Sequence, residues 1–153
     1  MRKLLQALVL GGAVWAAPGW ADDDDIVRVQ AAGDVAATMA ALEAAVEGAG
    51  ATVFAKVDHG AGAEGAGLEL GASQLLIFGN PQLGTPAMQA NPLAGLYLPL
   101  KVLVYEDAGG QVWLAYEAPE ETLDDLEGID DDAAYIGKMT GALSKLTKKA
   151  AGG

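Results

Sequence analysis

The hydrophobic positions of the first third of this chain recur with two periods. Residues 26–30 and 52–58 alternate between apolar and polar, which predicts two half-buried strands. Between them lies an amphipathic stretch that follows Asp34, a residue type favoured as a helix N-cap. Its apolar residues recur at helical spacing, which predicts a helix that ends at Gly48 to Gly50: Val35, Met39, Leu42 and Val46.

The middle of the chain predicts shorter elements. The continuous apolar run 75–78 is typical of a strand covered on both faces, and such a strand would form the centre of a sheet. Thr85 followed by Pro86 predicts an N-cap and the first residue of a short helix over 86–90. Residues 100–106 and 112–117 predict two strands, joined as a hairpin by Asp107-Ala108-Gly109-Gly110.

The last part of the chain predicts helices. A short acidic helix is expected over 119–126, and a longer amphipathic helix follows it. The three aspartates at 130–132 would cap the longer helix, and this role is favoured over a calcium site. Its apolar stripe is expected to face the core: Tyr135, Ile136, Met139, Leu143 and Leu146. We expect residues 150–153 to be disordered.

The order of these elements indicates an α+β fold. A hairpin and helices that are separated from the strands predict a mainly antiparallel sheet backed by two longer helices. No internal repeat and no second domain is recognisable, so residues 22–149 are expected to form a single domain.

The first 21 residues predict a cleavable export signal. Arg2 and Lys3 precede the apolar stretch 4–17, and the small residues Gly19 and Ala21 lie at the positions that a signal peptidase reads. The stretch is shorter than the roughly 20 apolar residues of a membrane span, although an uncleaved anchor is the alternative. The sequence therefore predicts a periplasmic or secreted protein with no membrane association after cleavage.

Charge and cysteine content exclude several function classes. The formal net charge is −12, and loss of Arg2 and Lys3 with the signal would lower it to −14. Binding to nucleic acids requires a basic surface that displaces counterions, so we expect no nucleic-acid partner. The absence of cysteine excludes disulfides, a lipid anchor on cysteine and thiolate metal sites.

His59 is the only histidine and follows a predicted strand directly. It could act as an acid or a base near neutral pH, with Asp58 or Glu64 beside it, or it could have only a structural role in its loop. One histidine is a poor basis for a zinc site, so no metal is predicted. A non-covalent haem held by His59 and a methionine remains open, and the cofactor is unknown.

The pattern Gly60-x-Gly62-x-x-Gly65 formally matches a dinucleotide-binding motif. The motif also requires an acidic residue about 20 positions further on, and that position holds Thr85. In a chain with 21 glycines, such a match arises easily by chance. We therefore do not assign a dinucleotide to it.

The segment 78–99 is the most distinctive part of the chain. It contains Phe78-Gly79-Asn80-Pro81, Gly84-Thr85-Pro86, Met88, Asn91-Pro92 and Leu98-Pro99, with His59 before it and Gly110 to Tyr116 after it. From about residue 26 to 146 the chain resembles the family called domain of unknown function 302. The resemblance implies an α+β fold similar to the TATA-binding-protein-like class, with a curved antiparallel sheet. Tyr97 stands where that pattern has an aspartate.

Three hypotheses of function remain open. The first is a binding or accessory module for a small molecule, and its candidate ligand-binding residues are His59, Asn80, Thr85, Gln89, Asn91 and Tyr97. The second is an enzyme that uses His59 as its acid or base. The third is a structural module that forms a homo-oligomer through exposed strands.

The first hypothesis carries a topological expectation. His59 ends one strand and Gly79 ends the next, and the long connection between the two strands favours a parallel crossover. Parallel strands would bring His59 and the loop after Gly79 into one cleft.

Overall fold

Five antiparallel strands form one sheet, in the order β1-β5-β4-β3-β2. The computed structural model describes residues 25–152. The predicted signal at 1–21 lies outside this range. The strands are β1 (Ile26–Gln30), β2 (Thr52–Asp58), β3 (Ser73–Gly79), β4 (Leu100–Glu106) and β5 (Val112–Glu117).

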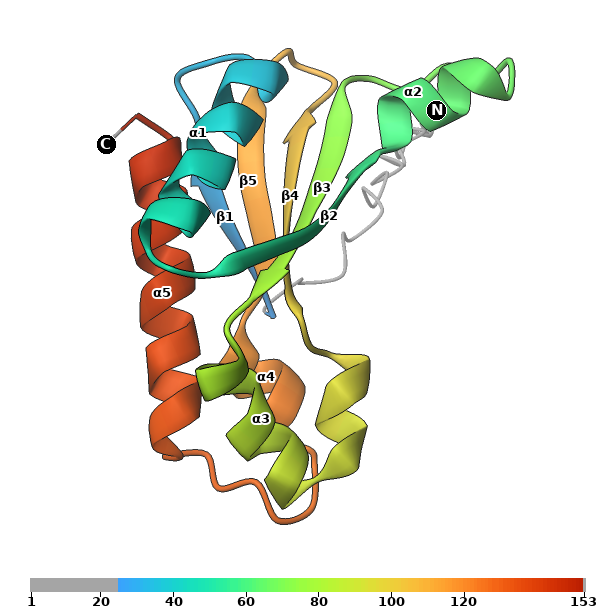
Figure 1. Cartoon of the computed structure of the whole chain (residues 1–153). Coiled ribbons are helices and arrows are strands. Elements are labelled where there is room, and N and C mark those ends of the chain that lie inside the picture. The colour runs from blue at the N-terminus through green and yellow to red at the C-terminus, as the bar shows by residue number, and fades with distance from the viewer. Residues whose placement is uncertain (1–24, 153) are drawn as a thin grey trace, which may run out of the picture.

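Two longer helices, α1 (Val35–Gly48) and α5 (Ala134–Ala150), pack against each other on one face of this sheet (Figure 1). The shorter helices lie at the two ends of the strands. Helix α2 (His59–Gly65) projects from one end (Figure 1). At the other end lie α3 (Pro81–Ala90), the 3-10 helix η1 (Pro92–Leu96) and α4 (Pro119–Leu123). The predicted α+β fold, with a mainly antiparallel sheet and two longer helices, is confirmed.

The main core lies between the sheet and the helices α1 and α5. The alternate residues of the strands meet in register there, as Leu76 does with Val102 and Val104 with Leu114. The apolar stripe of α1, including Leu42 and Val46, packs on them. Burial of each such side chain contributes about 1.5–3 kcal/mol, so this layer supplies most of the hydrophobic stabilisation.

A second apolar cluster holds the short helices at the lower end of Figure 1. It is built from small and large side chains of α3, η1, α4, α5 and the connection between α4 and α5: Ala87, Ala94, Leu123, Ile129, Ile136 and Met139. Each of them is at most 6% exposed. This cluster gives the end of the molecule around α3 its own core.

The prediction that strand 75–78 is covered on both faces and lies at the sheet centre is wrong. The central strand is β4, and β3 lies between β4 and the edge strand β2. Leu76 and Phe78 are buried beneath the helices, whereas Leu75 and Ile77 are half-buried on the opposite face. A continuous apolar run therefore arises here because both sheet faces carry apolar side chains, although the helices of residues 25–152 cover only one face.

The β4–β5 hairpin forms around Asp107, as the sequence predicts. The Oδ1 atom of Asp107 accepts bonds from the backbone N–H groups of Gly109 (2.8 Å) and Gln111 (2.9 Å). Its Oδ2 atom accepts a bond from Trp113 Nε1 at 2.8 Å. Bonds to the charged carboxylate, led by that of Gln111, lower the pKa of Asp107. Gly110 supplies the positive φ of 79° that the turn requires.

Helix α3 begins earlier than the sequence pattern predicts. Its N-cap is Asn80, whose Oδ1 atom accepts the N–H of Gln82 at 2.9 Å, and Pro81 follows in the first turn. Thr85 is therefore not the N-cap, and Pro86 lies inside the helix. Asn80-Pro81 is itself a start signal of the same kind, and it lies before Thr85-Pro86 in the sequence.

Helix α5 also differs at both ends. Its N-cap is Ala133, without a side-chain bond, so the predicted cap by the aspartates at 130–132 is wrong. Four of the five predicted stripe residues are buried, and Tyr135 is half-buried. Ala150 still belongs to the helix and is buried, and the Ala32 N–H donates to the Ala151 carbonyl at 3.1 Å. The predicted disordered tail therefore does not include Ala150 or Ala151.

Residues 25–152 lack both a membrane-spanning helix and a cluster of metal-binding side chains. No helix within residues 25–152 is long and apolar enough to cross a membrane. The same residues contain no group of three or more histidine, aspartate or glutamate side chains placed to hold a metal ion.

Candidate functional site

His59 and Asn80 lie at opposite ends of strand β3. Strands β2 and β3 are antiparallel, with Thr52 opposite Gly79 and Asp58 opposite Gln74. The expectation of a shared cleft is therefore wrong. The connection after His59 is not a crossover, because α2 and the loop that follows it reverse the direction of the chain. His59 is the first residue of α2 and is exposed.

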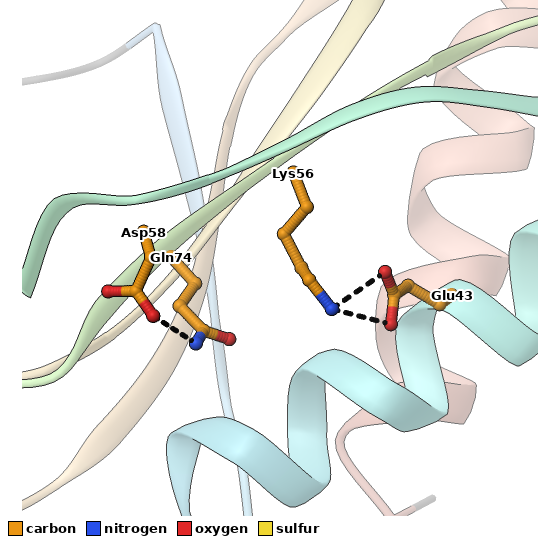
Figure 2. Close-up of polar contacts among 4 residues, drawn as sticks. All are labelled: Glu43, Lys56, Asp58 and Gln74. Atoms are coloured by element: carbon orange, nitrogen blue, oxygen red, sulfur yellow. Dashed lines mark hydrogen bonds and ion pairs between the residues drawn. The ribbon is translucent and has the colours of Figure 1, made fainter. Parts of the chain in front are cut away.

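Polar contacts fix the start of α2. Asp58 caps the helix, because its Oδ1 atom accepts the Ala61 N–H at 2.8 Å. Its Oδ2 atom accepts a bond from the Gln74 side-chain amide at 2.8 Å, as Figure 2 shows. These bonds, chiefly that from Ala61, lower the pKa of the Asp58 carboxyl group.

Figure 2 also shows Lys56 Nζ between the two carboxylate oxygens of Glu43 on α1, at 3.0 and 3.1 Å.

The glycine pattern in α2 serves the backbone rather than a phosphate. A Cβ atom added to Gly60 would lie 3.3 Å from the Gly71 carbonyl oxygen and 3.4 Å from Asp58 Oδ1. The first N–H groups of the helix face the Asp58 carboxylate, whose negative charge repels an anion. The groove beside α2 also contains Glu64 and Glu69, and no residue that lines it is basic.

An apolar cleft of about 370 Å³ lies at the opposite end of β3, and we call it the α3 cleft. Its walls come from β2, the β3–α3 junction, α3, α5 and the segment before β4. Met139 is one of its lining residues and is only 1% exposed, whereas Phe54 is 56% and Met88 38% exposed. The lining residues are Phe54, Gly79, Asn80, Pro81, Leu83, Gly84, Thr85, Met88, Leu98, Pro99, Leu100 and Met139.

Two glycines shape this cleft. A Cβ atom at Gly79 would lie 3.3 Å from Phe54 Cε2 and 3.5 Å from Pro99 Cβ, so its absence lets the walls approach each other. At Gly84 the nearest atoms to such a Cβ are Leu98 Cδ1 and Met88 Cε, both at 3.7 Å, which is an ordinary contact distance. Gly84 therefore leaves space where a larger side chain would project.

Two of the six predicted ligand-binding residues line the α3 cleft, namely Asn80 and Thr85. Asn80 also caps α3, so its Oδ1 atom is already engaged. Thr85 is exposed at the cleft.

The other four predicted residues lie elsewhere. Asn91 is structural, since Oδ1 accepts the Leu93 N–H at 2.9 Å and Nδ2 donates to the Glu127 carbonyl at 3.0 Å. Gln89 is exposed and does not line the cleft. Tyr97, 38% exposed, lines a separate narrow pocket beside Lys101 and Glu117. His59 lies at the far end of the sheet.

Sequence reasoning missed the apolar walls of the cleft. Leu98 lies in the distinctive segment 78–99, but its pattern did not mark it as a cleft residue, and Met139 belongs to the core stripe of α5. Phe54 could have been noticed, because it is a large apolar residue out of phase with Val53 and Val57. A β-bulge between Val53 and Ala55 accounts for its placement.

Comparisons with known proteins agree with this architecture. The family model described as "Domain of unknown function DUF302" matches residues 27–146. A crystal structure of an uncharacterised conserved DUF302 protein from Bacillus stearothermophilus superposes with a TM-score of 0.71. It is 20% identical, and the match covers 82% of this chain and 98% of that one.

Curated relatives match over a longer stretch. Proteins named "Fluoride-specific ion channel FluC 1" from Brucella suis and Brucella abortus are each 42% identical over 135 residues, which is 85% of this chain. The match covers 51% and 48% of those proteins. The chain thus spans about half the length of the curated relatives it matches.

Proposed function

This chain belongs to the DUF302 family, and from that premise we propose that it is an exported domain that binds a small apolar molecule in the α3 cleft. One observation carries the proposal. An apolar cleft of about 370 Å³ is held between a β-sheet and a separately packed group of helices. Ligand sites are typically concave, apolar and about 300–1,000 Å³ in volume, with a few polar groups.

The lining indicates the class of ligand. Phe54, Met88 and Met139 offer apolar and polarisable surface, which suits a flat or aromatic molecule. Asn80 and Thr85 are the side chains that could bond to one polar group on it. The lining contains no charged residue, and the chain has a net charge of −12. We therefore expect a neutral ligand at the small end of the usual size range.

The names of the curated relatives suggest a related, accessory role. The chain matches about half of proteins named as ion channels, and its described residues contain no membrane-spanning helix. We propose that the matched half of those proteins is a domain of this fold and that channel activity resides in the other half. The α3 cleft lacks the positive groups that would favour fluoride.

The neutral fluorescent probe N-phenyl-1-naphthylamine tests the proposed cleft. We expect saturable binding to the wild-type protein and binding at least roughly tenfold weaker after Gly84→Leu, because the new side chain projects into the cleft. Thermal stability should not fall, since a helical glycine is replaced and the Cβ contacts are ordinary. Gly137→Leu is the matched control on α5, where a Cβ atom meets nothing within 4 Å.

The outcomes are distinct. Wild-type protein without saturable binding, or equal binding by the Gly84→Leu variant, would remove the cleft from consideration.

Mass spectrometry of protein from the native periplasm would identify a retained ligand. N-terminal sequencing of the same material tests export, for which the mature chain should begin at Asp22.

A further inference from the structure

The sheet face opposite α1 and α5 carries apolar side chains on all five strands. Because paired residues point to the same face, the register places Val57 beside Leu75, Leu75 beside Leu103, and Leu103 beside Ala115. Figure 1 shows the two long helices on the other side of the sheet. The apolar members of this open face are Ile26, Ala55, Val57, Leu75, Ile77, Leu103, Tyr105, Trp113 and Ala115.

We propose that a second copy of this chain docks on the open face. The two sheets then pack face to face around a two-fold axis near Leu103, which lies on the central strand β4. Aligned sheets pack about 10 Å apart, with their strands rotated by about 30°. Such an arrangement removes from water the half-buried side chains that residues 25–152 of one copy leave uncovered.

Charge favours a copy of the same chain on this face. A chain with a net charge of −12 repels its own copies over most of its surface. The open face is different, because its charged residues are Arg28, Lys101 and Glu117, two basic and one acidic. Two copies therefore meet with least repulsion at this face.

The Lys101–Glu117 pair makes the face self-complementary. Lys101 Nζ lies 3.5 Å from Glu117 Oε2 within one copy, and both side chains remain partly exposed. A two-fold axis places the same pair on both partners, so that each lysine can also meet the glutamate of the other copy. The pair then contributes to the relative orientation of the copies rather than much to their affinity.

The area of the open face is compatible with a small dimer interface. Five strands about 4.8 Å apart give a width of about 24 Å, and strands of five to seven residues give a length of about 20 Å. Side-chain relief makes the accessible area larger than this flat outline. A standard interface buries about 800 Å² on each partner, so an outline of about 480 Å² corresponds to a small interface and a concentration-dependent dimer.

Sedimentation velocity across a dilution series tests the proposal on protein expressed from the full-length gene. The wild type should sediment as a dimer at the higher concentrations. Leu103→Lys should weaken dimerisation by roughly a hundredfold or more, since it buries an unpaired charge at the centre of the interface. Leu93→Lys is the matched control, because Leu93 is 56% exposed and lies on η1, away from the open face.

A cysteine experiment covers the case in which Leu103→Lys fails to fold. The chain contains no cysteine, so a single Leu103→Cys substitution gives one thiol near the axis. Oxidation should form a covalent dimer much faster than in Ala108→Cys, whose thiol lies on the hairpin turn. A wild type that stays monomeric, a folded Leu103→Lys variant that stays dimeric, or equal cross-linking of the two cysteine variants would each overturn the proposal.

Discussion

Strand β3 joins two glycine-containing ends of the molecule that are built very differently. At its start lies α2, with no buried residue, and its two neighbouring leucines, Leu68 and Leu70, are 67% and 56% exposed. At its end lie α3, η1 and α4, which enclose a buried cluster of their own. Both ends use a polar N-cap, Asp58 for α2 and Asn80 for α3.

Glycine and a polar N-cap are enough to shape a connection between strands, but not to enclose a site. Around α2 the backbone is fixed by Asp58 and by the close approach at Gly60, yet the side chains face solvent. Around α3 the same devices are combined with burial of Ala87, Leu123 and Met139, which holds the cleft walls in place. A pocket needs walls that have their own core behind them.

Truncation of an apolar side chain should change the free energy of unfolding very differently at the two ends of β3, and this is the largest effect that we expect. We expect Leu123→Ala to lower the free energy of unfolding by about 2–5 kcal/mol, because Leu123 is 1% exposed and its loss leaves a cavity. Leu68→Ala, the same change beside α2, should alter it by no more than about 0.5 kcal/mol. Urea unfolding followed by circular dichroism measures both. Equal effects would show that the two ends do not differ in packing.

Acid should weaken the N-cap Asp58 but not the N-cap Asn80, and this effect should be smaller than that of side-chain truncation. The folded pKa of Asp58 is lowered, so its stabilisation of α2 is present above the ordinary value of 3.8 and is lost as the pH falls through the folded value. Asn80 does not titrate. We therefore expect the Ala61 amide to lose protection from hydrogen exchange below pH 3.8, relative to the Gln82 amide in α3.

Asp58→Asn is the control for this experiment. Asparagine is also a good N-cap, but it carries no titratable group. The variant should keep α2 at neutral pH and show no selective loss at the Ala61 amide in acid. Parallel loss at both caps, or an unchanged difference in the variant, would contradict the assignment to Asp58.

His59→Ala should have the smallest effect. His59 is exposed and lies away from the α3 cleft, so we expect a stability change within about 0.5 kcal/mol and unchanged binding of N-phenyl-1-naphthylamine. Thermal unfolding and the probe titration measure the two quantities. A loss of probe binding would mean that the α2 end contributes to ligand binding after all.

The strands and long helices of this fold could be predicted from local patterns. The strands 26–30, 52–58, 100–106 and 112–117 have the predicted bounds, because alternation and turn residues such as Asp107 and Gly110 act locally. The direction of β2 against β3 could not be derived in the same way. It depends on how α2 returns the chain to the sheet, and glycine-rich sequence is compatible with either path.

The candidate site was predicted only in part, for a similar reason. Asn80 and Thr85 were among the predicted residues because polar side chains in a turn-rich segment are typical of ligand sites, and both line the α3 cleft. Phe54, Leu98 and Met139 come from three remote segments, and only the tertiary fold brings them to one cleft. Asn91 shows the opposite error, since an asparagine that forms a structural bond to the Glu127 carbonyl looks the same in the sequence as one that contacts a ligand.

The pairing of β1 with β5 sets an order of events during synthesis. Ile26 pairs with Glu117, so the first strand has no partner until about 90 further residues have been made. At about 5–20 residues per second, that wait lasts roughly 5–20 seconds. Val27 and Val29 stay uncovered during this interval, whereas the β4–β5 hairpin closes at once on its short turn. A nascent chain of this topology therefore cannot complete its sheet until β5 has been made.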